Sequence, residues 1–167
     1  MTNPPPPEYD PHEQPVLDDI AKYGWSGIII EKDDEGPGFE YTVGLMAKFD
    51  HPEVIVFGCK RETGHGMLWA IVRGIEEGTP FTAGIKHNHV LEGYPCESRL
   101  VHESQHPEYL GYAIWHHRHF GKLGPLRAVQ CVWPDRDGRF PGEPGCDANA
   151  ERDQPDLRQV LPTQPRP

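Results

Sequence analysis

Long apolar runs are missing from this sequence. No stretch approaches the roughly 20 consecutive apolar residues that a membrane-spanning helix needs. The sequence also opens without the charged and then apolar segments of a secretory signal. We therefore expect a cytosolic protein that does not insert into a membrane.

Positive charge is scarce as well. The chain has 16 Lys and Arg residues against 26 Asp and Glu residues, which gives a formal net charge of −10. Nucleic acids and anionic membranes are bound through basic patches that neutralise phosphates. The composition therefore argues against nucleic-acid and membrane-surface binding, and it leaves a small molecule or another protein as the expected partner. Nothing in the sequence indicates an oligomeric state.

Several cofactor and metal motifs are absent. The chain has no G-x-G-x-x-G, no G-x-x-x-x-G-K-[ST] and no C-x-x-C. Its four cysteines are widely spaced, and in a cytosolic protein of this size we expect them to be reduced. No cofactor can be named from these patterns.

The strongest pattern lies in residues 39–58. Apolar residues alternate with Glu40, Thr42 and Gly44, which predicts a strand with one buried face. Pro52 precedes the uninterrupted apolar run 54–57, which is typical of a strand buried on both faces. Gly44 indicates a bulge or the close approach of another backbone or a ligand.

Periodic segments predict the remaining elements. Helical spacing predicts helices over 15–23, 61–77 and 107–120, and the glycines of the second favour a late start near His65. Strands are predicted over 25–31, 97–102 and 126–133, with one or two short strands within 81–91. Short turns between consecutive strands favour an α+β fold. We expect a curved, mostly antiparallel sheet or small barrel of about six strands, with the two longer helices on one side. The short N-terminal helix is an additional element.

Proline marks both ends of the chain. Residues 1–14 include four consecutive prolines, residues 151–167 hold four more, and neither segment has an apolar period. We interpret both as extended or disordered tails, with proline-rich ligands for partner domains as the alternative. A single globular domain is thus predicted over residues 15–150.

Four motifs, in this order and spacing, resemble a known family. They are FEYTVGL at 39–45, HPE at 51–53, QCVWPD at 130–135 and GRFP at 138–141. Together they resemble family 4262 of the domains of unknown function, over residues 23–147. The resemblance implies a small bacterial cytosolic protein and supplies no activity, so no catalytic residue can be carried over from it.

Histidine is abundant, with ten residues in the chain. His102 and His106 precede the predicted helix 107–120, and His116 lies within it, so the three side chains could converge on a metal ion. The alternative is structural, because histidines in the last turn of a helix complement its dipole.

Two other kinds of site can be formulated. Cys59 follows a strand just before a helix, where a thiol pKa is lowered, and His65 could serve as its base; the alternative is a buried structural cysteine. Tyr41, Trp115 and Arg127 could hold a flat anionic ligand against the sheet, unless the aromatic residues only form a core.

These candidates support two hypotheses. The leading one is a small cytosolic ligand-binding or protein-interaction domain without catalysis of its own. The alternative is an enzyme with a histidine-centred site, with or without a metal. The enzyme requires at least three polar candidates to meet in one cleft, whereas the binding domain requires a concave aromatic pocket or an exposed apolar patch.

Overall fold

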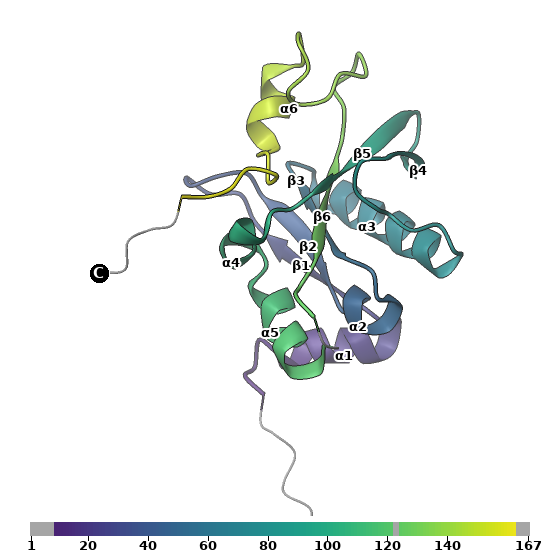
Figure 1. The fold of residues 1–167 in the computed structure, drawn as a ribbon, viewed down its shortest axis with the longest axis vertical. Coiled ribbons are helices and arrows are strands. Elements are labelled where there is room, and N and C mark those ends of the chain that lie inside the picture. The colour runs from purple at the N-terminus through teal and green to yellow at the C-terminus, as the bar shows by residue number, and fades with distance from the viewer. Residues whose placement is uncertain (1–8, 122–123, 163–167) are drawn as a thin grey trace, which may run out of the picture.

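The structure, a computed structural model, describes residues 9–121 and 124–162 and contains one mixed sheet (Figure 1). Its strands are β1 (Ser26–Ile30), β2 (Phe39–Val43), β3 (Glu53–Phe57), β4 (Lys86–Leu91), β5 (Tyr94–Leu100) and β6 (Ala128–Val132). Its helices are α1 (Gln14–Tyr23), α2 (Leu45–Phe49), α3 (Arg61–Glu76), α4 (His106–Tyr109), α5 (Gly111–Phe120) and α6 (Ala148–Asp153), with a 3-10 turn at Glu103–Gln105. No described helix combines the length and apolar character needed to cross a membrane.

The strand order is β1-β2-β3-β6-β5-β4, and β3 and β6 form the one parallel pair in the described sheet. The α+β class and the mostly antiparallel sheet are therefore confirmed. A closed barrel is wrong, because β1 and β4 are the two edges of an open sheet. The strand predicted at 54–57 is correct, and every residue of β3 is buried.

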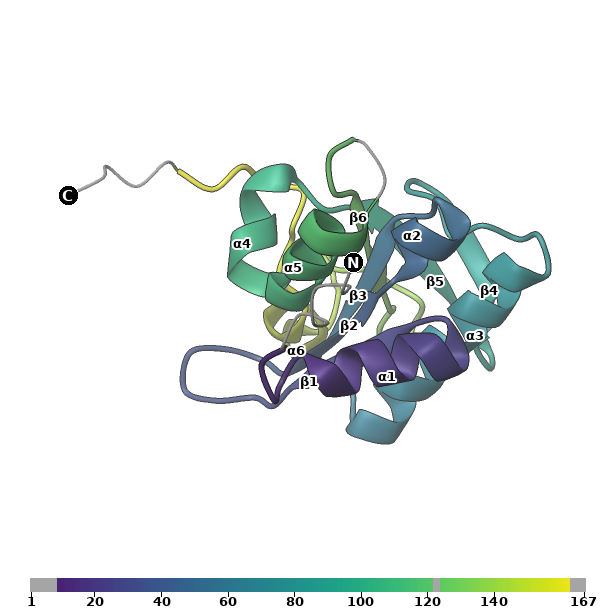
Figure 2. The ribbon, with the colours of Figure 1, turned by 90° about the horizontal axis from the view of Figure 1, so that it is seen from below.

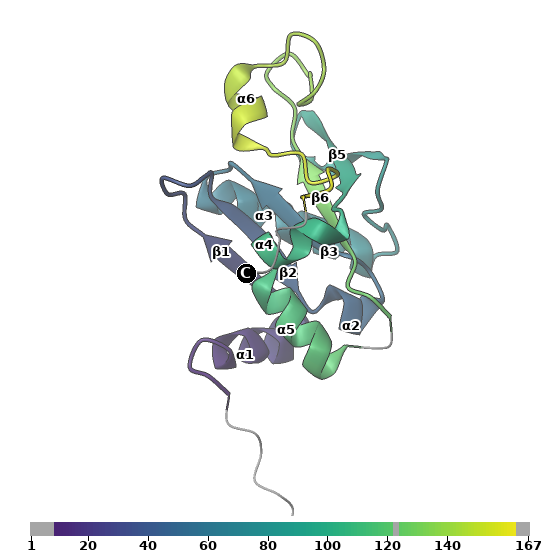
Figure 3. The same cartoon turned by 60° about the vertical axis from the view of Figure 1, so that its left-hand side comes forward.

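The two long helices lie on opposite sides of the sheet, which corrects the prediction that they share one side. Val54 and Val56 point into a core with Leu68 of α3. Ile55 and Phe57 point into a second core that α4 and α5 cover. Figures 2 and 3 show α3 on one side of the sheet and α4 and α5 on the other. A strand that is apolar on both faces needs a cover on each, and this explains the three-layer arrangement.

Two helix predictions need local corrections. Helix α3 begins at Arg61 rather than near His65. Gly64 is accommodated in its first turn, where the Gly64 N–H donates to the carbonyl of Lys60 at 2.9 Å. The predicted helix 107–120 is two helices, because Leu110 leaves the helical conformation (φ −112°, ψ 38°) between α4 and α5.

The first part of the segment predicted as a C-terminal tail contains helical and buried residues. Residues 151–153 complete α6, and Gln154 and Leu157 are buried. The carbonyl of Leu157 accepts a hydrogen bond from the N–H of His102 at 2.8 Å. The limits proposed for the globular domain stay a prediction, and the four prolines at 4–7 lie outside the described residues.

A buried carboxylate holds the turn between β2 and β3. Glu53 accepts hydrogen bonds from the Thr42 hydroxyl (2.9 Å) and from the N–H groups of Leu45 (3.1 Å), Gly44 (3.3 Å) and Met46 (3.3 Å). Gly44 has φ 110°, a conformation that L side chains rarely adopt, and it precedes α2 rather than forming a bulge within β2. Burial raises the pKa of Glu53 to about 7, although all four hydrogen bonds act in the opposite direction.

Candidate functional site

The three histidines predicted as metal ligands have separate roles. His102 accepts a hydrogen bond from the Ser104 N–H at the start of the 3-10 turn (3.2 Å). His106 is buried in α4, and His116, on α5, stacks on Phe120 with ring centroids 5.1 Å apart. Among residues 9–121 and 124–162, no group of three or more His, Cys, Asp or Glu side chains is placed to hold a metal ion. The structure therefore does not bring His102, His106 and His116 together as a ligand set.

Cys59 and His65, predicted as a nucleophile and its base, have other partners. The Cys59 sulfur lies 3.7 Å from both the Phe57 carbonyl oxygen and the Met67 sulfur. Burial raises the pKa of the Cys59 thiol to about 12, so the reactive thiolate is strongly disfavoured. Cys59 is half-buried at the edge of a cavity, and these contacts favour a structural role over a nucleophilic one.

The predicted ligand-binding residues are also apart. The Tyr41 hydroxyl accepts a hydrogen bond from the Tyr112 N–H at 3.0 Å, and Trp115 packs edge-on against Tyr9. Arg127 lies on the exposed loop before β6 and pairs with Asp50 at 2.8 Å. Of the three predicted residues, Tyr41 lines a cavity, and it does so without Trp115 or Arg127.

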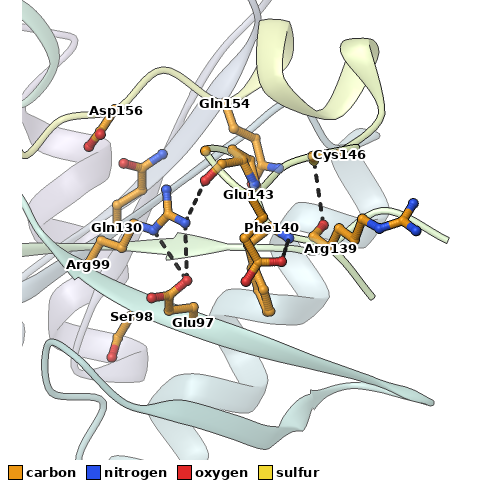
Figure 4. Close-up of polar contacts among 12 residues, drawn as sticks. Glu97, Ser98, Arg99, Gln130, Arg139, Phe140, Glu143, Cys146, Gln154 and Asp156 are labelled. Carbon is orange, nitrogen blue, oxygen red and sulfur yellow. Dashed lines mark hydrogen bonds and ion pairs between the residues drawn. The ribbon is translucent and has the colours of Figure 1, made fainter. Parts of the chain in front are cut away.

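Arg99 of β5 is a buried arginine that is already paired. Its Nη2 donates to Glu97 (3.1 Å) and to the carbonyl of Pro141 (2.9 Å), as Figure 4 shows. These contacts tie β5 to the loop before α6. The guanidinium therefore holds this loop in place.

The carboxylate of Glu40, which the sequence patterns did not single out, is the partner of His65. Glu40 is 4% exposed on β2, and its Oε1 lies 2.6 Å from Nδ1 of His65 on α3. Room for the carboxylate depends on Gly27 of β1, where a Cβ would lie 2.6 Å from Oε1. The pair joins two elements that lie side by side only in the folded protein.

A tryptophan fixes the orientation of His65. The indole N–H of Trp69 is a donor only, and it donates to Nε2 of His65 at 2.9 Å. His65 therefore carries its proton on Nδ1 and donates it to Glu40. Trp25 stacks on the imidazole ring at a centroid distance of 6.0 Å and further limits its movement.

Glu40 retains one acceptor atom for a ligand. Within the described residues no hydrogen bond reaches Oε2 of Glu40. Burial raises the pKa of this carboxyl group, while the hydrogen bond and charge of His65 and the charge of Arg61 act in the opposite direction. A carboxyl group of this kind can accept a proton or a hydrogen bond from a bound molecule.

Glu40 lines a cleft with a volume of about 420 Å³, which we call the Glu40 cleft. The cleft lies where β3 ends and α3 begins, between the β1–β2 loop and the end of α6. Its apolar lining includes Ile29, Ile30, Phe39 and Val56. This is the end of the sheet, toward α6 in Figure 1, where the parallel strands β3 and β6 have their carboxyl ends, a frequent place for ligand sites in open sheets.

Four cationic side chains line the same cleft: Lys32, Lys60, Arg61 and Arg152. Arg152 is paired with Asp153 at 2.9 Å, and Arg61 lies 3.9 Å from Glu31. Neither Lys32 nor Lys60 forms an ion pair with a described residue. The N-terminus of α3, which carries partial positive charge, opens at Lys60 and Arg61.

Sequence patterns found one residue of this site and missed the other. His65 was selected for its nearness to Cys59 in the chain, whereas its real partner, Glu40, is 25 residues away. In a strand whose apolar residues alternate with polar ones, a carboxylate at a polar position is expected to face solvent. The useful signal was Gly27, because a Cβ at this position would lie 2.6 Å from Oε1 of Glu40.

Comparison with known proteins identifies a family. The family model described as Domain of unknown function (DUF4262) matches residues 19–147, and the chain belongs to this family. The resemblance seen in the sequence motifs is thereby confirmed. No curated protein and no solved structure matches the chain.

Proposed function

We propose that the protein binds a small organic oxyanion in the Glu40 cleft. The observation that supports this most strongly is the gathering of four cationic side chains around one cleft in a chain of net charge −10. Glu31, Glu40 and Asp153 also line the cleft, and Lys32 and Lys60 are the cations that form no ion pair with a described residue. A local excess of positive charge attracts anionic ligands. The volume of about 420 Å³ is in the range of small-molecule sites.

Each part of the cleft favours a different part of such a ligand. Lys60, with the N-terminus of α3, favours a carboxylate or phosphate group. Oε2 of Glu40 favours an O–H or N–H donor beside that group. Ile29 and Val56 favour an apolar carbon body. The proposed ligand is therefore an oxyanion that also carries a hydrogen-bond donor, such as a phosphate monoester or a hydroxy acid.

Removal of one cation tests the position of the site. Lys60→Gln should weaken the binding of inorganic phosphate by about three- to tenfold, because an exposed charge next to a bound anion contributes modestly. Lys22→Gln is the matched control, since Lys22 is exposed on α1 and does not line the cleft. Calorimetric titration measures both affinities, and equal weakening by the two substitutions would contradict the proposal.

A steric substitution tests the role of Glu40 independently. Gly27→Ala adds a Cβ at 2.6 Å from Oε1, so the carboxylate must move and its hydrogen bond with His65 must lengthen. We expect a changed ¹⁵N shift of His65 Nδ1 and weaker phosphate binding. Gly36→Ala is the control, because a Cβ at that position meets no heavy atom within 4 Å.

An enzyme that transfers a proton through Glu40 is the second candidate function. The observation that favours it is the pairing of a buried carboxyl group of raised pKa with an imidazole of fixed orientation. His65 would then be a positioning residue and Glu40 the base. Such an enzyme would convert its cleft ligand, and Glu40→Gln would abolish turnover while ligand binding remained. The cytosolic location and a protein partner stay predictions under either function.

A further inference from the structure

A second cavity lies on the opposite face of the β1–β2 hairpin from the Glu40 cleft. Its volume is about 550 Å³. Phe39 and Tyr41 face it, whereas Glu40, between them on β2, faces the cleft. Both cavities are lined by Ile30, Glu31, Pro37 and Phe39 of the hairpin. Cationic side chains line the Glu40 cleft, whereas none of the described cationic side chains lines the second cavity.

Aromatic rings form the floor of this cavity. Phe39 and Tyr109 meet edge to face with centroids 5.4 Å apart, and Phe39 lies 6.3 Å from Tyr41. Tyr112 completes the lining, and its backbone N–H fixes the Tyr41 hydroxyl. The rings come from β2 and from the two helices α4 and α5, so their arrangement depends on the complete fold.

Carboxylates form the rim. Glu31, Asp33, Glu35 and Glu108 line the cavity, and none of its lining residues is Lys, Arg or His. Asp33 is held in place because its Oδ1 accepts hydrogen bonds from the N–H groups of Glu35 (2.9 Å) and Gly36 (3.2 Å). Asp33, Glu35 and Glu108 form no ion pair with a described residue. The negative charge at this rim is therefore not neutralised by the protein.

We propose that this second cavity binds a small organic ammonium ion. The faces of aromatic rings attract cations, and recognition of quaternary ammonium groups by sets of aromatic rings is a known use of this attraction. The carboxylate rim attracts the same charge from a longer range. A concave cavity of about 550 Å³ suits a free small molecule with a methylated ammonium group. This proposal is independent of the oxyanion proposed for the Glu40 cleft.

Choline and its uncharged isostere 3,3-dimethylbutan-1-ol are the probes that test the proposal. Calorimetric or NMR titration of the full chain should give at least about tenfold tighter binding of choline, because the two molecules differ in charge and hardly in shape. Equal affinity for the two probes would mean an apolar cavity and would overturn the proposal. So would the absence of choline binding at about 50 mM, well above the range expected for such a site.

Substitutions of lining residues test whether choline binds in the second cavity. The double substitution Glu35→Gln and Glu108→Gln should weaken choline binding about three- to tenfold, and Tyr109→Leu should also weaken it. Glu92→Gln, in the exposed turn between β4 and β5, is the control and should change nothing. An unchanged affinity in the Glu35/Glu108 variant would place choline elsewhere and refute the assignment. Tighter binding of a peptide with trimethyllysine than of choline would refute the assignment to a free small molecule.

Discussion

Replacement of Glu53 by glutamine should change how the stability of this protein depends on pH. Glu53 is 3% exposed, and burial raises its pKa from 4.5 to about 7 in the folded protein. In the unfolded chain the side chain is in water and titrates near its ordinary value. Glutamine does not titrate, so Glu53→Gln removes this contribution and leaves the rest of the pH dependence in place.

The direction in which stability changes with pH depends on whether the folded or the unfolded state binds the Glu53 proton more tightly. The folded protein holds the Glu53 proton more tightly than the unfolded chain does, so the contribution to stability is full below pH 4.5 and is lost as the pH rises through about 7. Its size follows from the two pKa values, at about 1.4 kcal/mol for each pH unit, and is about 3 kcal/mol. In Glu53→Gln, the amide N–H₂ group cannot accept hydrogen bonds from the backbone N–H groups that it faces. The variant should therefore be less stable than the native protein at every pH.

Urea unfolding, followed by circular dichroism from about pH 4.5 to about pH 8, measures this difference. The free energy of unfolding of the native protein minus that of the variant should fall by about 3 kcal/mol across this range. Glu92→Gln, an exposed glutamate in a turn, should give a constant difference. Parallel curves for the native protein and Glu53→Gln would refute the reasoning, because they would mean that Glu53 titrates alike in the folded and unfolded states.

Two further predictions concern α3 and the thiol before it. A Cβ at Gly66 meets no heavy atom within 4 Å, so Gly66→Ala should raise the free energy of unfolding by about 1 kcal/mol. At Gly74 a Cβ would lie 2.8 Å from Nε2 of His89, so the imidazole must move and Gly74→Ala should raise it less, and urea unfolding of the two variants compares them directly. Iodoacetamide should alkylate Cys59 at least about 100-fold more slowly in the native protein than in urea, because burial raises the pKa of its thiol to about 12. Mass spectrometry of timed samples measures this, and similar rates would contradict it.

The parts of the fold that were predicted correctly depend on short segments of sequence. The alternation in 39–45 and the unbroken apolar run in 54–57 are local patterns, and both became strands. The same run could have indicated that helices cover both faces, since a strand that is apolar on each side cannot leave one of them in water. Closure into a barrel depends on which strands pair, and no local pattern carries that information.

The parts that sequence patterns did not predict depend on contacts between distant residues. Leu110 interrupts the helix predicted over 107–120, and its side chain is fully buried in the second core. Leu157 is buried within a segment whose composition is typical of a tail. In the candidate site, His65 meets Glu40 across the space that Gly27 leaves empty. A glycine in a strand shows that room is needed, but not which side chain will occupy it.

The central claim is that Oε2 of Glu40 accepts a donor from an oxyanion bound in the Glu40 cleft. Calorimetric titration of the native protein and Glu40→Gln with phosphate and sulfate at pH 7 tests it most directly. Phosphate carries an O–H donor at this pH and sulfate carries none, so the native protein should bind phosphate at least about tenfold more tightly. In Glu40→Gln the amide oxygen can still accept from His65 while its N–H₂ faces the cleft, and sulfate should bind at least as tightly as phosphate. The same preference in both proteins, or no binding of either anion, would contradict the claim.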